Sequence, residues 1–115
     1  MKISEISTLL GANVLCCKES LSHEVHSACG SDMMSDVLAY VKNQAVLLTG
    51  LVNPQVIRTA MMMDMRCIVF VRDKKPSDEM IELAKEADIV LLSTPLRMFD
   101  ACGILYTEGL RPNEV

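Results

Sequence analysis

Three apolar runs decide the fold: AVLLTGLVNP at residues 45–54, CIVFV at residues 67–71 and DIVLLSTP at residues 88–95. Each contains a near-continuous stretch of Val, Ile, Leu or Phe, which is typical of strands buried on both faces of a parallel sheet. A strand exposed on one face would instead alternate between apolar and polar residues. The sequence therefore predicts parallel strands at residues 45–49, 67–71 and 88–92.

Helix signals stand between and after these strands. Asn53-Pro54 places a capping side chain before a proline at the first helical position and predicts a helix to about Asp64. Ser77 is the predicted cap of the next helix, and Thr94-Pro95 repeats the Asn53-Pro54 pattern before a helix that carries Phe99. Helices between parallel strands imply right-handed crossovers, so we expect helices to cover both faces of the sheet.

The N-terminal segment is predicted to add a helix and two further strands. An amphipathic helix begins near Ile3, with Ser4 available as its cap and Gly11 as its stop. Strands are expected at residues 12–16 and 24–29, and these form an antiparallel or mixed edge of the sheet.

A central helix is predicted to follow the second of these strands. Ser31-Asp32 offers its cap, Met34 and Val37 lie on its apolar face, and it ends near Lys42-Asn43. The fold class is therefore α/β, a three-layer sandwich whose central sheet is largely parallel with a mixed edge.

Composition and charge exclude several classes of protein. The 115 residues, of which 50% are hydrophobic and 23% charged, fit one domain over residues 1–115. A net charge of −4 and an aromatic content of 3% argue against nucleic-acid binding. The apolar run at residues 45–57 is too short to span a membrane. Five cysteines without C-x-x-C spacing argue against a disulfide framework, so we expect a cytoplasmic protein.

Motifs of the common catalytic classes are absent from the sequence. It contains no G-x-x-x-x-G-K-[ST] phosphate loop, no G-x-G-x-x-G, no G-x-S-x-G and no H-E-x-x-H. We therefore expect a non-catalytic protein. The alternative is a small enzyme that uses Asp32 or Asp73 as a base near Ser93 or Thr94.

Polar residues follow each predicted parallel strand. The carboxyl ends of parallel strands share one edge of a sheet, where ligands commonly bind. Hydroxyls, an amide, a glycine and cations at this edge suit an anionic or polar small molecule. The alternative is that these residues are helix caps and a solvated basic loop. The predicted ligand-binding residues are Ser31, Asp32, Thr49, Gly50, Asn53, Arg72, Asp73, Lys74, Ser93 and Thr94.

A group of cysteines and histidines lies within fourteen residues of the N-terminal half: Cys16, Cys17, His23, His26 and Cys29. Thiolate and imidazole are ligands that zinc prefers. The spacing is unfavourable, because a strand at residues 24–29 would point His26 and Cys29 to opposite faces. We expect no metal site, and interpret these cysteines as small buried hydrophobic residues.

Methionines form the densest side-chain pattern: Met61, Met62, Met63 and Met65. Consecutive helical residues are about 100° apart, so these side chains cannot all face one core. Flexible thioethers suit adaptable interfaces, and the hypothesis is that these four residues form a homodimer interface. The alternative is a helix that is buried on nearly all sides within one chain.

Several segments of the chain resemble a known family in their order and spacing. These are KISEI at 2–6 followed by GANVL at 11–15, GSDMMSDV at 30–37, LLTG at 47–50 leading to Pro54, and LLSTP at 91–95. The chain resembles the DRTGG domain, a module related to the N-terminal domain of HPr kinase/phosphorylase. The resemblance implies a fold like that N-terminal domain.

The residues that give this family its name are missing. Val52-Asn53 stands where the family has Asp-Arg, and Arg72-Asp73-Lys74 stands where it has Thr-Gly-Gly. Loss of the glycine pair removes a close backbone approach that a phosphate or ribose would use. Arg72, Lys74 and Lys75 offer a different anion site.

The resemblance also implies a class of function. Relatives are fused to phosphotransacetylases, lie between CBS domains in regulatory pyrophosphatases, or stand alone beside iron-only hydrogenase subunits. They imply a homodimeric regulatory or assembly module, with an adenine nucleotide or another anion as ligand and redox enzyme subunits as partners. Kinase activity is not implied, because the phosphate loop is absent. The alternative is a ligand-free dimeric scaffold.

Overall fold

A five-stranded sheet forms the centre of the computed structural model, which describes residues 1–40 and 45–112. The strand order is β1-β5-β4-β3-β2, with β1 antiparallel to β5 and every other neighbouring pair parallel. The predicted α/β class and the mixed edge are confirmed. The strands are β1 (Asn13–Cys16), β2 (Ser27–Gly30), β3 (Ala45–Thr49), β4 (Cys67–Phe70) and β5 (Val90–Ser93).

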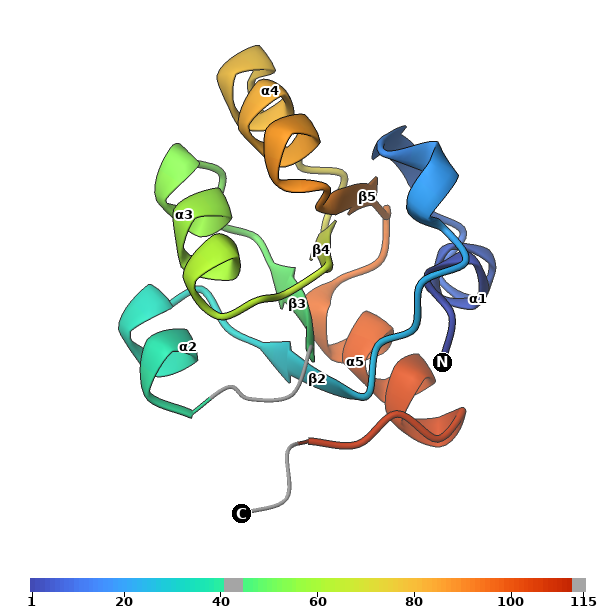
Figure 1. Cartoon of the computed structure of the whole chain (residues 1–115). Coiled ribbons are helices and arrows are strands. Elements are labelled where there is room, and N and C mark those ends of the chain that lie inside the picture. The colour runs from blue at the N-terminus through green and yellow to red at the C-terminus, as the bar shows by residue number, and fades with distance from the viewer. Residues whose placement is uncertain (41–44, 113–115) are drawn as a thin grey trace.

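Helices cover both faces of this sheet and produce three layers. Figure 1 shows α2, α3 and α4 side by side on one face, and α1 and α5 on the other. None of the helices in the described part of the chain is long and apolar enough to cross a membrane. The helices are α1 (Ile3–Leu9), the short 3-10 helix η1 (Lys18–Ser20), α2 (Met34–Tyr40), α3 (Pro54–Met62), α4 (Asp78–Ala87) and α5 (Met98–Thr107).

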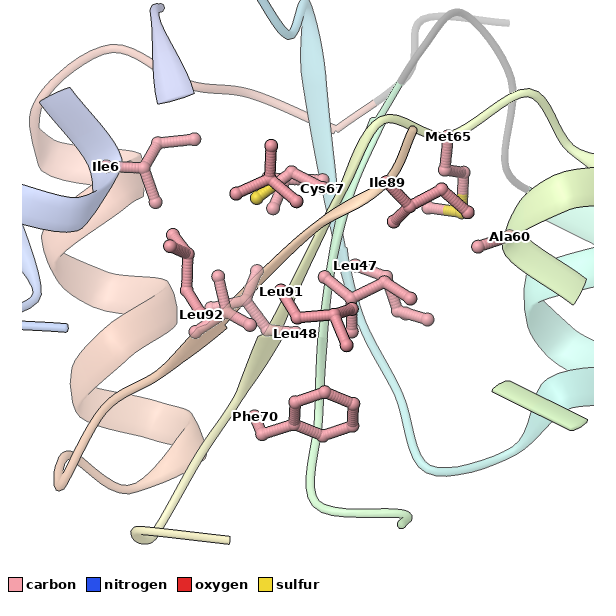
Figure 2. Close-up of a cluster of buried hydrophobic side chains, with 14 of the residues drawn as sticks. Ile6, Leu47, Leu48, Ala60, Met65, Cys67, Phe70, Ile89, Leu91 and Leu92 are labelled. Atoms are coloured by element: carbon pink, nitrogen blue, oxygen red, sulfur yellow. The ribbon is translucent and has the colours of Figure 1, made fainter. Parts of the chain in front are cut away.

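The core lies on both sides of the three parallel strands β3, β4 and β5. Every residue of these strands is buried. Figure 2 shows Ile6 of α1 on one side of the strands, and Ala60 of α3 with Met65 on the other. Burial on both faces explains why these strands read as continuous apolar runs rather than as alternating patterns.

Two of the predicted helix caps are confirmed. The Oδ1 atom of Asn53 accepts a hydrogen bond from the backbone N–H of Gln55 at 2.9 Å, with Pro54 at the first helical position of α3. The Oγ atom of Ser77 accepts from the N–H of Met80 at 3.3 Å at the start of α4. These side chains replace hydrogen bonds that the first turn of a helix cannot make.

The caps predicted for α1 and α5 are wrong. Helix α1 is capped at Lys2 rather than Ser4, because the Glu5 side chain reaches back to the Lys2 N–H at 3.2 Å. Helix α5 begins at Met98, and Thr94 is not its cap. The Thr94 hydroxyl is buried and donates to the Leu10 carbonyl at the end of α1, at 2.7 Å. That tertiary bond satisfies an otherwise unpartnered helix-end carbonyl.

Other element boundaries shift by one to three residues. Strand β2 begins at Ser27 instead of residue 24, because Glu24 pairs with Lys2 in an isolated bridge. Strand β5 begins at Val90, since Asp88 adopts a left-handed conformation (φ 55°) that ends α4. The helix end predicted at Lys42-Asn43 lies outside the described residues.

Replacing Gly11 or Gly103 with alanine should change the stability of the protein in opposite directions. Gly11 has φ +57°, Gly103 lies within α5, and an added Cβ would meet no atom within 4 Å at either position. Gly103→Ala should raise the free energy of unfolding by about 0.5–1 kcal/mol, because alanine loses less backbone entropy in a helix. Gly11→Ala should lower it by about 1–2 kcal/mol, because a Cβ disfavours the left-handed region. Urea unfolding measures both, and changes of the same sign would contradict the backbone assignment.

Candidate functional site

An open cleft of about 490 Å³ lies at the edge of the sheet where the parallel strands end. It is formed by the residues that follow β2, the residues that follow β4 and the start of α5. Crossover topology places these segments together, because each parallel strand ends at the same edge. The lining residues are Gly30, Ser31, Asp32, Val71, Arg72, Arg97, Met98 and Phe99.

Asp32 ties the end of β2 to the end of β3. Its Oδ1 atom accepts a hydrogen bond from the Thr49 hydroxyl at 3.0 Å and from the Gly50 N–H at 2.7 Å. Thr49 is buried, and its Oγ1 atom also accepts from the Leu51 N–H at 3.1 Å. The carboxylate therefore fixes one wall of the cleft while its own side chain faces solvent.

Arg72 enters the cleft from a strained turn after β4. Arg72 and Asp73 both have positive φ, 57° and 59°, and the Lys74 N–H closes the turn onto the Val71 carbonyl at 3.2 Å. Residues with a Cβ adopt this conformation at a cost of roughly 1 kcal/mol each. The backbone is held there by the N–H groups of Arg72 and Asp73, which donate to the carbonyls of Leu96 (2.7 Å) and Thr94. Such strain is commonly retained at functional sites.

The Arg72 guanidinium lies directly over Gly50. A Cβ atom at Gly50 would sit 2.5 Å from the Arg72 Nη2 atom, so a larger residue would push the arginine away. Arg97 also lines the cleft. It precedes α5 and makes no side-chain capping bond to that helix. Among the described residues, no carboxylate forms an ion pair with Arg72 or Arg97. Both cations are therefore available to a ligand.

Phe99 supplies an aromatic surface beside these cations. Its side chain is 87% exposed, although the chain contains only two phenylalanines and no tryptophan. A phenyl ring in water is unfavourable, and an exposed ring next to guanidinium groups forms a platform for a flat ligand that carries negative charge.

The structure brings half of the predicted ligand-binding residues together. Ser31, Asp32 and Arg72 line the cleft, and Thr49 and Gly50 lie directly behind it. The rule that ligands bind at the carboxyl ends of parallel strands therefore locates one wall of the cleft.

The other five predicted residues have structural contacts or point elsewhere. Asn53 caps α3, and Asp73 pairs with Lys75 at 3.5 Å on the surface. Ser93 is buried and donates to the Lys74 carbonyl at 3.0 Å. Thr94 is buried against α1, and Lys74 does not line the cleft.

Arg97, Met98 and Phe99 are cleft residues that the sequence interpretation missed. The Thr94-Pro95 pattern placed the start of the helix too early, so Arg97 and Phe99 were assigned to its interior. The sequence does contain a signal that could have found them. Arg97-Met98-Phe99 follows the end of a parallel strand after only a short loop, and residues in that position commonly lie at a ligand site.

The five residues considered for metal binding do not converge. Within the described chain, the one group of three ligands lying within 4.8 Å of one another is Cys17, Glu19 and Asp88, and it contains only one of the five. Burial, the adjacent Cys16 thiol and then the Asp88 and Glu19 carboxylates raise the pKa of Cys17 from 9.0 to about 12. Cys17 is therefore a protonated, buried thiol in this structure.

The methionine run divides between the surface and the core. Met61 and Met62 are 50% and 72% exposed, and Met63 is half-buried. Met65 is 2% exposed and packs in the core, so its inclusion in the interface hypothesis is corrected (Figure 2). Asp64 has a positive φ of 54°, so the backbone leaves the direction of α3 at this residue. Met65 therefore does not lie on the exposed side of the helix with Met61 and Met62.

Comparison with protein families matches the DRTGG domain over residues 5–107. The fold is similar to the crystal structure of the CBS and DRTGG domains of the regulatory region of Clostridium perfringens pyrophosphatase, complexed with its activator diadenosine tetraphosphate. The TM-score is 0.74 at 18% sequence identity, which shows likeness of fold. The match covers 90% of this chain and 45% of that chain, so this chain spans less than half of it. Comparison with curated proteins finds no match.

Asp32→Ala should destabilise the protein, whereas Asp32→Asn should retain most of its stability. The alanine leaves the buried Thr49 hydroxyl and the Gly50 N–H without their acceptor, which costs about 1–2 kcal/mol. Asparagine keeps the Oδ1 acceptor and is the matched control. Chemical denaturation measures the difference, and equal stability of the two variants would show that Asp32 does not hold this edge.

Stability should fall as the pH rises above about 9. Burial raises the pKa of Cys67, Cys17, Cys29 and Cys102, so the folded chain keeps thiol protons that the unfolded chain loses. The native state then binds more protons, and the free energy of unfolding decreases by up to about 1.4 kcal/mol per pH unit for each fully protonated thiol.

Urea unfolding at a series of alkaline pH values measures this slope. Cys67→Ala removes one buried thiol and should make the slope shallower while lowering stability at neutral pH. A slope that is the same in wild type and Cys67→Ala would exclude Cys67 as a source of the pH dependence.

Proposed function

The chain belongs to the DRTGG domain family, whose profile spans residues 5–107, and from this premise we propose that it is a non-catalytic regulatory module. Its ligand is an anion of the nucleotide class, bound in the cleft at the carboxyl ends of the parallel strands. The observation that carries the proposal is that Arg72 and Arg97, neither of which forms an ion pair with any described residue, line one cleft together with the exposed ring of Phe99.

The chemistry of the cleft matches the parts of a nucleotide. Planar guanidinium groups bind phosphate through paired charge-assisted hydrogen bonds, and Arg72 and Arg97 would hold that part. A nucleobase would stack on Phe99, since every base has a flat face. The free acceptor capacity of Asp32 suits the hydroxyl groups of a sugar, whereas the Ser31 hydroxyl already accepts from the Met33 N–H at 3.0 Å and donates to the Met33 carbonyl at 3.3 Å.

The structural neighbour agrees with this class of ligand. The regulatory region of the Clostridium perfringens pyrophosphatase binds diadenosine tetraphosphate as its activator. That region also contains CBS domains, so the likeness supports the general class of ligand rather than a position for it.

A non-catalytic role is supported by the burial and hydrogen bonding of the hydroxyl groups at the strand ends. Ser93 and Thr94 are the nucleophiles that an enzyme at this edge would use. Both are buried, and both donate hydrogen bonds to backbone carbonyls. Asp73 makes no direct hydrogen bond to either hydroxyl among the described residues. It contacts Lys75 at 3.5 Å, and the Lys75 ammonium, which is a donor and not a base, also donates to the Ser93 Oγ atom at 3.4 Å.

Arg72→Ala and Arg97→Ala should each abolish a ligand-induced rise in melting temperature. At a ligand concentration about a hundred times Kd, binding adds about 2.7 kcal/mol, which corresponds to a shift of roughly 10 °C. Differential scanning fluorimetry with ATP, AMP, diadenosine tetraphosphate and inorganic phosphate measures the shift. Arg58→Ala removes an exposed arginine from α3 and is the charge-matched control. A full shift in both cleft variants would place the ligand elsewhere.

Gly50→Ala tests the geometry without removing a charge. The new Cβ would lie 2.5 Å from the Arg72 guanidinium and should displace it, weakening binding at least tenfold while the protein stays folded. Gly103→Ala, at a position with open space, should bind like wild type. Isothermal titration with the best nucleotide compares them, and unchanged affinity in Gly50→Ala would show that Arg72 does not contact the ligand.

A further inference from the structure

An apolar cavity that the proposed nucleotide site does not use lies between α5 and the edge strand β2. Its volume is about 210 Å³, and its walls come from β2, β3, α5 and the segment that follows α5. We call this space the α5 cavity. Gly30 lines both the α5 cavity and the cleft, but the arginines and the phenyl ring of the cleft do not reach into the cavity. The α5 cavity is therefore a separate space with its own chemistry.

The α5 cavity exists because β2 presents its smallest side chains to α5. Side chains alternate along a strand, so Ala28 and Gly30 share the face that α5 covers, while Ser27 and Cys29 point to the other face. Gly30 is paired in register with Leu48 of β3, which also lines the cavity. An alanine and a glycine cannot fill the space between the sheet and the helix, so a hollow remains there.

The walls of the α5 cavity are hydrocarbon. Leu48, Leu105 and Leu110 are all buried and line it. An apolar cavity of about 150 Å³ is already large enough to bind a benzene ring. Atoms that line an empty space of this kind lose dispersion contacts, and a hydrocarbon ligand restores them. The cavity therefore fits one ring or a chain of a few carbon atoms.

One charged side chain, Arg111, also lines the cavity. Its guanidinium carbon lies 4.0 Å from the centre of the Tyr106 ring, and the group donates a hydrogen bond to the Tyr106 carbonyl. The backbone is anchored as well, because the Ala28 N–H donates to the Arg111 carbonyl at 3.1 Å. Arg111 forms no ion pair with any described residue. A cation is thus held in place beside an apolar cavity and has N–H groups left for an anion.

We propose that the α5 cavity binds a small carboxylate whose hydrocarbon part is a short chain or a single ring. The hydrocarbon packs against Ala28 and Leu105, and the carboxylate accepts hydrogen bonds from the Arg111 guanidinium. One guanidinium matches one carboxylate in charge and in its paired hydrogen-bond geometry. No second cation of the described residues lines this cavity, whereas Arg72 and Arg97 both line the cleft, so a doubly charged phosphate suits the cleft better.

NMR titration of the 15N-labelled full chain with sodium hexanoate tests the proposal. Wild type should bind hexanoate with a dissociation constant of about 1 mM or lower, and the amide signals of Ala28, Tyr106 and Leu110 should shift. Acetate has four fewer methylene groups, each of which changes affinity by about fourfold when buried, so acetate should bind at least tenfold more weakly. The neutral alcohol 1-hexanol should also bind at least tenfold more weakly, because it cannot pair with Arg111.

Two variants separate the apolar and the charged parts of the site. Ala28→Leu places a larger side chain in the cavity and should abolish hexanoate binding. Arg111→Gln removes the charge and leaves the apolar walls, so hexanoate should lose its preference over 1-hexanol. Arg58→Gln is the matched control, because it removes an exposed arginine from α3 on the other face of the sheet, and it should bind hexanoate like wild type (Figure 1).

Three results would each overturn the proposal. These are no saturable shift with hexanoate up to tens of millimolar, equal hexanoate affinity in wild type and folded Ala28→Leu, or an unchanged preference for hexanoate over 1-hexanol in Arg111→Gln. Far-UV circular dichroism establishes folding, and Arg111→Gln alters an exposed side chain and decides the matter if Ala28→Leu does not fold. Arg72→Ala should bind hexanoate like wild type, so failure of the nucleotide site would leave this result unaffected.

Discussion

Burial of three adjacent parallel strands on both faces is the constraint on which the rest of the structure depends. Strands β3, β4 and β5 have no exposed residue, so helices must cover the sheet from two sides. Parallel pairing requires each connection to cross from one end of the sheet to the other, and the crossovers supply those helices. The same geometry places the loops that follow the parallel strands at one edge of the sheet, and the loops that lead from the helices back into the strands at the opposite edge. The cleft is therefore a consequence of how the core is buried.

Particular side chains at that edge determine the shape and charge of the cleft. Asp32 fastens two strand ends together through Thr49 and Gly50, and the absence of a side chain at Gly50 leaves room for the Arg72 guanidinium. The left-handed turn at Arg72 and Asp73 is held by backbone bonds to the segment that precedes α5. That segment also carries Arg97, so one set of main-chain contacts positions both cations.

The cleft edge of the sheet and the exposed methionines lie at opposite ends of helix α3. Helix α3 starts beside the cleft, where Asn53 caps it, and ends at the exposed methionines. The absence of the family's Thr-Gly-Gly residues is compatible with the proposed ligand site, in which arginine side chains would take the place of the backbone approach that glycines allow.

The sequence by itself determined the parallel core and the caps at Asn53 and Ser77, because these depend on short-range periodicity and on capping residues next to the helices they start. It also determined part of the lining of the cleft. Ser31, Asp32 and Arg72 were predictable because strand ends converge in any parallel sheet. Tertiary structure alone decided that Thr94 bonds the end of α1 and does not cap α5, which moved Arg97 and Phe99 into the cleft. It also decided that Met65 is buried while Met62 is exposed. Such outcomes depend on partners distant in sequence, and local patterns carry no information about which distant group a side chain will meet.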